Sequence, residues 1–270
     1  MIYNKKSYAK VNIGLHVLNK REDNYHNLST YFHKIDLFDD IQIEILPSSG
    51  LSVNIKGNES YLTSGLDLME KAAVAFSSAA NIKFCLNIII KKRIPQQAGL
   101  AGGSSNAATI LKTLNEHFNI YTTDELITLS LTVGSDLAFF IYDKSAAYAL
   151  SRGELLSEVE SVKYPILLIK KGSVSTSSAF SKIKPYKKEL PAWTTDLALW
   201  PKLYTNDFDI IQEIREEELF VNALKNYYNT TTGSGAAQVV IFSSFKERED
   251  FILNNNLFIS SYSIYLSELI

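Results

Sequence analysis

The chain has 270 residues, of which 46% are hydrophobic and 21% are charged, a balance typical of folded globular proteins rather than of disordered segments. Lysine and arginine total 27 against 29 aspartates and glutamates, so no excess of positive charge is present to bind nucleic acid. A single cysteine, Cys85, excludes an internal disulfide, and no apolar run approaches the roughly 18 residues of a membrane span. We therefore expect a cytoplasmic protein without nucleic-acid or membrane partners.

The first quarter of the sequence predicts strands. Residues 9–17 alternate apolar and polar side chains, as in a strand, and strand-like runs follow at 31–37, 41–46 and 51–55, separated by turn-forming residues. Apolar residues then recur at helical spacing from Leu66 to Phe76, which indicates a helix.

The most informative stretch lies in the second quarter. Residues 84–90 are rich in isoleucine and predict a buried strand. A glycine-rich segment follows, and an amphipathic pattern from Ala107 to Phe118 predicts a helix immediately after it. A further helix is expected at 124–131. The order of elements is therefore strand, glycine segment and helix.

The pattern changes near residues 151–153, where we place a domain boundary. Beyond it, strands and helices alternate, which predicts a second domain of mixed α and β structure. The expected strands are 164–169, 237–242 and 260–266, and the expected helices are 177–183, 208–215, 217–228 and 245–253. Residues 184–204 hold three of the six prolines and have no clean period, so they predict a long surface connection.

Residues 95–105, here called the glycine loop, predict an anion site. Three glycines fall between positions 99 and 103, and Ser104 and Ser105 follow at the start of the helix. Glycines allow a ligand to approach the backbone, and the N–H groups at a helix start attract negative charge. Either serine could cap the helix and present its hydroxyl to a phosphate or to a phosphate-bound magnesium ion. The simpler interpretation is a flexible loop with a capping serine. A P-loop is excluded because no lysine follows the glycines.

The glycine loop resembles the phosphate loop of the GHMP kinases, the superfamily of galactokinase and of homoserine, mevalonate and phosphomevalonate kinases. Four separate segments carry the resemblance, which covers nearly the whole length. Besides the glycine loop, these are Ala9–Asn12 with Arg21–Leu28, then Gly134–Asp136, and finally Thr232–Ala236, here called the C-terminal glycine motif.

The resemblance implies an α+β, two-domain GHMP kinase fold. Its N-terminal domain, residues 1–150, would resemble domain 2 of ribosomal protein S5 and bind ATP, and residues 151–270 would form a ferredoxin-like C-terminal domain. The best-matching branch phosphorylates the 2-hydroxyl of 4-diphosphocytidyl-2-C-methyl-D-erythritol in non-mevalonate isoprenoid precursor synthesis. We therefore expect a small-molecule kinase, a monomer or homodimer, that uses ATP and Mg²⁺.

By position, the resemblance makes Asp136 and Lys10 the catalytic pair. A carboxylate with an ordinary pKa is a weak base towards an alcohol, so Asp136 would mainly orient the attacking hydroxyl and accept its proton late. Lys10 would stabilise the negative charge that develops. An isolated aspartate after Gly-Ser is more often a turn residue, and the match of the other segments is what favours catalysis here.

The resemblance also implies a nucleotide site. Magnesium would be carried by the phosphates of ATP, with Ser105 as a candidate contact, and Lys92 would lie near the adenine. The expected ATP-binding residues are Lys92, Pro95, Gly99, Leu100, Ala101, Gly102, Gly103, Ser104 and Ser105.

The substrate residues implied by the resemblance are Asn12, Tyr25, His26, Thr176 and Phe180. His26 would hold the edge of the cytosine, because an imidazole carries both a donor and an acceptor. Tyr25 and Phe180 would stack on the two faces of the base, an interaction worth about 1–3 kcal/mol per base. Asn12 and Thr176 would add polar contacts.

Four positions depart from the family pattern without removing a proposed chemical group. Asp67 replaces an asparagine near the adenine, Asn24 a glycine, Gln97 a small residue and Ala138 a proline. Two alternatives stay open: a homoserine or mevalonate type of GHMP kinase, and a nucleotide-binding module without activity.

Overall fold

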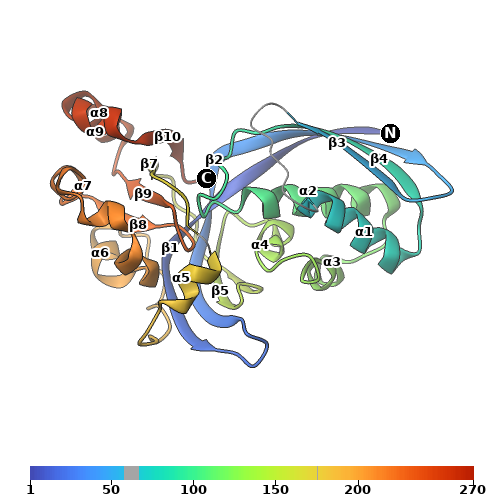
Figure 1. Ribbon diagram of the computed structural model, residues 1–270, viewed down its shortest axis with the longest axis horizontal. Coiled ribbons are helices and arrows are strands. Elements are labelled where there is room, and N and C mark those ends of the chain that lie inside the picture. The colour runs from blue at the N-terminus through green and yellow to red at the C-terminus, as the bar shows by residue number, and fades with distance from the viewer. Residues whose placement is uncertain (58–66, 175) are drawn as a thin grey trace. The chain divides into compact units, whose positions relative to one another are not determined.

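The computed structural model describes residues 1–57, 67–174 and 176–270, which group into two compact units (Figure 1). The first unit consists of residues 1–9, 37–96 and 101–144, and the second of residues 10–36, 97–100 and 145–270. Two long strands, β1 (Ile2–Lys20) and β2 (His26–Pro47), contribute to both units. The units are thus built from alternating segments, and the expected division into domains 1–150 and 151–270 stays a prediction.

The first unit combines helices with a mixed sheet. Strand β4 pairs antiparallel with the second half of β2, with Ile43 opposite Ile88, and parallel with β3. The elements are β3 (Ser52–Gly57), β4 (Phe84–Lys91), α1 (Leu68–Ala80), α2 (Gly102–Phe118), α3 (Thr123–Ser130) and α4 (Leu137–Tyr142). Helices α1, α3 and α4 all pack against α2, and Figure 1 shows the four helices together beside β3 and β4.

Local sequence explains where α1 lies. Its buried face consists of Met69, Ala72, Ala73 and Phe76, at the predicted helical spacing. Asp67, one of the departures from the family pattern, is the N-cap, and its carboxylate accepts a hydrogen bond from the backbone N–H of Met69 at 2.7 Å.

The second unit contains a ferredoxin-like arrangement. In the described part of the unit, the strands run antiparallel in the order β10-β7-β9-β8, and the chain visits them in the order strand, helix, strand, strand, helix, strand. The strands are β7 (Pro165–Lys170), β8 (Tyr228–Thr231), β9 (Ala237–Ile241) and β10 (Ser263–Glu268). The predicted ferredoxin-like domain is confirmed.

Shorter elements complete this unit. Strand β5 (Ala146–Ser151) pairs with the first half of β2, and β6 (Leu155–Glu158) pairs with β5. The helices are α5 (Thr176–Ser181), α6 (Trp200–Leu203), α7 (Glu218–Leu224), α8 (Phe245–Asn254) and α9 (Asn256–Ser261), with 3₁₀ turns η1 (Leu197–Leu199), η2 (Asp207–Ile211) and η3 (Glu213–Glu216).

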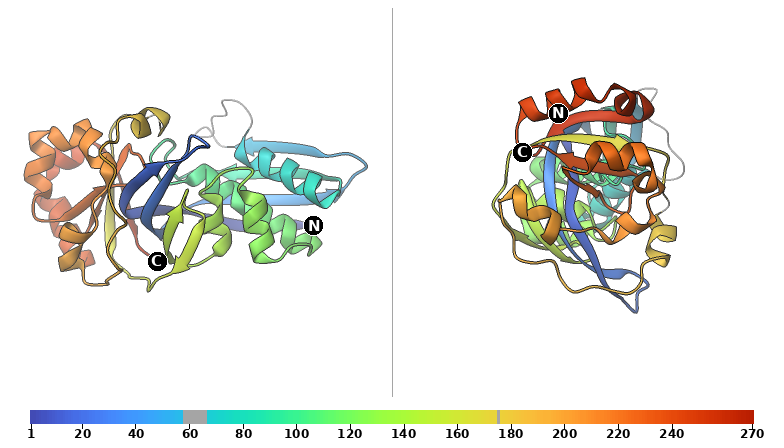
Figure 2. Two further views of the ribbon diagram at one scale, coloured as in Figure 1. Left: turned by 90° about the horizontal axis from the view of Figure 1, so that it is seen from below. Right: turned by 90° about the vertical axis from the view of Figure 1, so that its left-hand side faces the viewer.

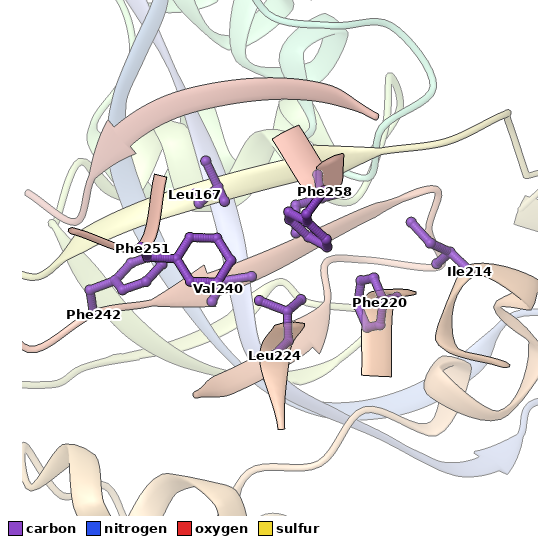
Figure 3. Close-up of a cluster of buried hydrophobic side chains, with 9 residues drawn as sticks. Leu167, Ile214, Phe220, Leu224, Val240, Phe242, Phe251 and Phe258 are labelled. Carbon is purple, nitrogen blue, oxygen red and sulfur yellow. The ribbon is translucent and has the colours of Figure 1, made fainter. Parts of the chain in front are cut away.

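One face of the β7–β9 sheet carries the main apolar core of this unit. Leu167 on β7 and Val240 on β9 face the helices α7, α8 and α9, whose aromatic side chains cover them (Figure 3). Phe251 and Phe258 are at most 4% exposed. Burying a side chain of this size contributes about 1.5–3 kcal/mol, so this cluster stabilises the sheet. The C-terminal glycine motif connects two strands of that sheet, β8 and β9. Figure 2 shows the same elements from two further directions.

Residues 184–204, predicted as a long surface connection, are only partly that: the segment contains η1 and α6, and Trp200 is buried. The backbone N–H of Lys187 donates to the carbonyl of Val17 at 3.0 Å, and that of Leu190 donates to the hydroxyl of Ser29 at 2.8 Å. These contacts hold the connection against strands β1 and β2.

Buried His33 gives the protein a predictable response to acid. Its Nδ1 donates to the carbonyl of Lys34 at 2.9 Å and its Nε2 accepts from the N–H of Val162 at 3.2 Å, an arrangement that requires the neutral ring. Burial lowers the pKa of His33 to about 4, so between pH 6.5 and 4 the unfolded chain binds the extra proton. Over that interval we expect the free energy of unfolding to fall by up to about 3 kcal/mol as the pH falls.

The test is denaturant unfolding at pH 7 and at pH 4.5 for the wild type and for His33→Gln. The variant should be less stable at pH 7 but lose less stability on acidification. An identical acid loss in both proteins would contradict the assignment.

Candidate active site

Residues 97–100 of the glycine loop belong to the second unit, where they meet the C-terminal glycine motif. The N–H of Ala237 donates to the carbonyl of Ala98 at 3.2 Å, and the hydroxyl of Thr232 donates to the carbonyl of Gly99 at 3.2 Å. Gly99 has a φ of +75°, and a Cβ atom there would stand 2.0 Å from the carbonyl oxygen of Thr232. Only glycine therefore fits at this crossing of two chain segments.

The Lys10 side chain is fixed beside this crossing. It is 3% exposed, and its Nζ donates to Oδ1 of Asn12 at 2.7 Å and to the carbonyl of Gly99 at 3.4 Å. Its ammonium also lies 4.9 Å from the centre of the Phe32 ring. A buried ammonium needs such partners, since desolvation would otherwise disfavour its charged form.

Asn12 connects three parts of the second unit. Besides accepting from Lys10, its Oδ1 accepts from the N–H of Gly233 at 2.8 Å, and its Nδ2 donates to the hydroxyl of Thr30 at 2.8 Å. Both ends of the amide are therefore engaged inside the protein, and Asn12 positions Lys10 and the C-terminal glycine motif. Its expected contact with substrate stays a prediction.

Helix α2 begins differently from the prediction. The helix starts at Gly102, and its N-cap is Ala101, which has a φ of 54° and makes no side-chain capping bond. The predicted cap by Ser104 or Ser105 is therefore wrong, because both serines lie within the first turn. Ser105 is 2% exposed and donates its hydroxyl to the carbonyl of Tyr8 at 2.6 Å. The first turn of α2 is left without a side-chain cap, as an anion-binding helix start requires.

A buried carboxylate that sequence analysis missed holds the strand end before the glycine loop. Asp39 is 0% exposed and accepts from the N–H groups of Arg93 and Ile94 at 2.7 and 2.9 Å, and it forms an ion pair with Lys92. A Cβ atom on Gly102 would stand 2.8 Å from the Ile94 side chain, so Ile94 lies directly beneath the start of α2.

The ion pair bears on the expected role of Lys92. Its ammonium is bound to Asp39 within the first unit, and its contact with adenine stays a prediction. Pro95 follows this anchored segment at the start of the glycine loop. The sequence pattern places Asp39 between expected strands at 31–37 and 41–46, whereas β2 runs through this position, so no local signal singled it out.

Asp136 lies in the first unit at the N-terminus of α4. Its side chain is half-buried and does not cap the helix, whereas the five residues that follow it are buried against the rest of the unit. Ala138, which stands where the family pattern has proline, is one of these and is 0% exposed. Packing of α4 against α2 therefore fixes the backbone that carries the carboxylate. Lys10 belongs to the second unit, and its pairing with Asp136 stays a prediction.

The expected substrate residues His26 and Phe180 come together. Their rings are stacked with centres 5.0 Å apart and planes at 23°, and Tyr186, which sequence analysis did not single out, meets the His26 ring edge-on at 6.2 Å. Partial burial and the charge of Lys20 lower the pKa of His26. In its neutral form, which this shift favours, the imidazole offers one donor and one acceptor.

Tyr25 remains accessible beside this cluster, with 54% of its surface exposed. The guanidinium of Arg152 lies 5.0 Å from the centre of its ring. Asn24 precedes it with a φ of 66°, which confirms that asparagine fits the turn in place of glycine. The side chain of Thr176 lies outside the described residues.

The described residues contain neither a membrane-spanning helix nor a cluster of metal-ligating side chains. No helix in residues 1–57, 67–174 and 176–270 is long and apolar enough to cross a membrane. Within the same residues, no three histidine, cysteine, aspartate or glutamate side chains gather as a metal site would need.

Comparison with known proteins points to one family. The family model described as the N-terminal domain of GHMP kinases matches residues 67–144. A 4-diphosphocytidyl-2-C-methyl-D-erythritol kinase from Clostridium botulinum is 35% identical over 246 residues, which cover 90% of this chain and 81% of that protein. The kinase of the same name from Bacteroides fragilis is 35% identical over 254 residues, covering 87% and 90%.

A solved structure gives the same indication. The crystal structure of a 4-(cytidine 5'-diphospho)-2C-methyl-D-erythritol kinase superposes with a TM-score of 0.78 at 25% identity and covers 99% of both chains. The expected GHMP kinase fold is confirmed.

Replacement of Gly99 tests the crossing of the two glycine motifs. Gly99→Ala should lower the free energy of unfolding by about 3 kcal/mol, because the new methyl group would overlap the Thr232 carbonyl at a left-handed φ. Denaturant unfolding measures the loss. Ala101→Gly, two positions along the same loop, is the matched control and should not destabilise the protein. Equal stability of Gly99→Ala and the wild type would contradict the observed packing.

Proposed function

The chain belongs to the family of 4-diphosphocytidyl-2-C-methyl-D-erythritol kinases within the GHMP kinases, and on that basis we propose the reaction that it catalyses. It transfers the γ-phosphoryl group of ATP to the 2-hydroxyl of 4-diphosphocytidyl-2-C-methyl-D-erythritol, a step of non-mevalonate isoprenoid precursor synthesis. The observation that supports this substrate best is the contact between the rings of His26 and Phe180, with the exposed Tyr25 next to His26 in the sequence, because flat rings suit a flat base.

The triphosphate of ATP binds along the glycine loop in this proposal. The uncapped first turn of α2 supplies N–H groups to the phosphates, and Gly103 is exposed there. Pro95 and residues 99–105 form the cradle, and Lys92 lies beside the adenine.

Magnesium would be carried by the phosphates of the nucleotide, with Ser105 as the candidate contact. The hydroxyl of Ser105 donates to the Tyr8 carbonyl, which fixes its position at the start of α2. The ion supplies neutralisation of the phosphate charge during transfer.

Catalysis rests on orientation and charge. Asp136 holds the attacking 2-hydroxyl and accepts its proton, while Lys10 stabilises the charge that develops on the transferred group. Because Lys10 is held by Asn12 and by the Gly99 carbonyl, its ammonium needs little reorganisation when substrate binds.

The same site recognises cytosine by its edge and its faces. His26 donates to and accepts from the base, Tyr25 and Phe180 stack on it, and Thr176 and Asn12 add polar contacts. We further propose domains at 1–150 and 151–270, a cytoplasmic location, and a monomer or homodimer.

Two alternatives are less well supported. Homoserine and mevalonate contain no flat base, so a kinase for either substrate would have nothing to stack between Tyr25 and Phe180. A module without activity would have no need to retain both Lys10 and Asp136.

Asp136→Asn tests the catalytic proposal. The amide cannot accept the proton, so kcat should fall by about 10²–10⁴ with little change in thermal stability. A coupled assay of ATP consumption with and without the diphosphocytidyl substrate measures it. Asp143→Asn removes a carboxylate from the other end of α4 and should retain normal turnover. Near-normal turnover by Asp136→Asn would remove this residue from the mechanism.

His26→Ala tests cytosine recognition. The Michaelis constant for the diphosphocytidyl substrate should rise roughly ten- to hundredfold, because a stacked and hydrogen-bonded ring is lost, while that for ATP should hardly change. Steady-state kinetics with each substrate varied separately gives both constants. His117→Ala removes a histidine of the first unit as a control. An equal rise for both substrates would argue against cytosine recognition.

A further inference from the structure

Strand pairing brings Arg152 to the turn that carries Tyr25. Strands β2 and β5 are antiparallel, with Leu28 opposite Ser151, so the residue that follows Ser151 emerges beside the residues that precede Leu28. The Arg152 guanidinium lies 5.0 Å from the centre of the Tyr25 ring. Two residues far apart in the sequence thus form a cation–π pair.

The turn beneath Tyr25 is itself held in place. Arg21 donates to both carboxylate oxygens of Asp23 at 3.1 Å and to the hydroxyl of Ser151 at 3.0 Å. Asp23 in turn accepts from the backbone N–H of Tyr25 at 3.1 Å. The backbone of Tyr25 is therefore held in place, while the residue as a whole is 54% exposed.

Arg152 is also oriented. Its backbone N–H donates to Oε2 of Glu154 at 2.7 Å, and its Nε lies 3.6 Å from Oε1 of the same carboxylate. The Arg152 side chain is 20% exposed, so most of its surface is covered by the protein. A single planar guanidinium can cover only one face of Tyr25.

We propose that Arg152 is a positioning residue for the nucleobase: it holds one face of Tyr25 so that the opposite face is presented to the cytosine. This inference rests on the proposed function. An exposed tyrosine ring would lose rotational freedom when a base stacks on it, and a ring already held by a cation loses less. Arg152 therefore acts on substrate affinity through Tyr25 and makes no contact with the reacting groups.

The test is a double-mutant cycle with a cation rescue. Arg152→Met keeps the aliphatic stem and should raise the Michaelis constant for the diphosphocytidyl substrate three- to tenfold, with kcat and the Michaelis constant for ATP unchanged. Arg152→Lys restores a cation over the ring and should recover most of the affinity. In a Tyr25→Leu background, Arg152→Met should have no further effect. A purely structural role would instead produce the same loss in both backgrounds, and that result, or an unchanged constant for Arg152→Met, would overturn the proposal.

Controls separate this proposal from the proposed function. Lys171→Met removes a cation that lies 5.8 Å from the Tyr262 ring elsewhere in the second unit and should leave both Michaelis constants unchanged. Binding of cytidine 5'-monophosphate to the wild type, measured by calorimetry, reports base recognition directly. If the wild type neither binds this nucleotide nor turns over the substrate, the proposed function fails. If it does both and Arg152→Met matches it, only the role of Arg152 fails.

Discussion

The buried ammonium of Lys10 sets the strongest constraint on the second unit. A lysine that is 3% exposed needs oriented acceptors around its ammonium, and these include Oδ1 of Asn12 on the same strand and the carbonyl of Gly99. The same Oδ1 accepts from the N–H of Gly233, which ties the C-terminal glycine motif to this arrangement. The strand, the glycine loop and the C-terminal glycine motif must therefore be in register for this charge to be tolerated. The same close packing requires glycine at position 99, because a side chain there would overlap the Thr232 carbonyl.

A second buried lysine, Lys92, has a structural role that its neighbours determine. Lys92 is paired with Asp39, a full negative charge that also accepts from the backbone of Arg93 and Ile94. Such a pair is expensive to bury and is sustained only by additional hydrogen bonds, which here fix the chain immediately before the glycine loop. The family resemblance placed Lys92 at the nucleotide, and the structure adds a scaffolding function for the same ammonium.

Much of the fold was predictable because its signals are local. The strand at residues 84–90, helix α1 and the strand–loop–helix order around the glycine loop follow from periodicity and glycine content. Other predictions failed where local patterns were ambiguous. Residues 208–215, predicted as a helix, form 3₁₀ turns. The helix predicted at 217–228 ends at Leu224, and Tyr228 instead begins β8, which pairs with β9.

The expected substrate residues were likewise predictable only in part. Sequence and resemblance found Tyr25, His26 and Phe180, and the structure brings the last two into contact. They could not find Tyr186 or Arg152, since each reaches its aromatic neighbour through tertiary structure: one from the connection held against β1 and β2, the other from the register of β2 with β5. Under the proposed function, the residues expected to contact the substrate carry strong motifs, whereas residues that hold them in place are recognised only after strand pairing is known. Substrate affinity would then depend on strand register as well as on the motif residues themselves.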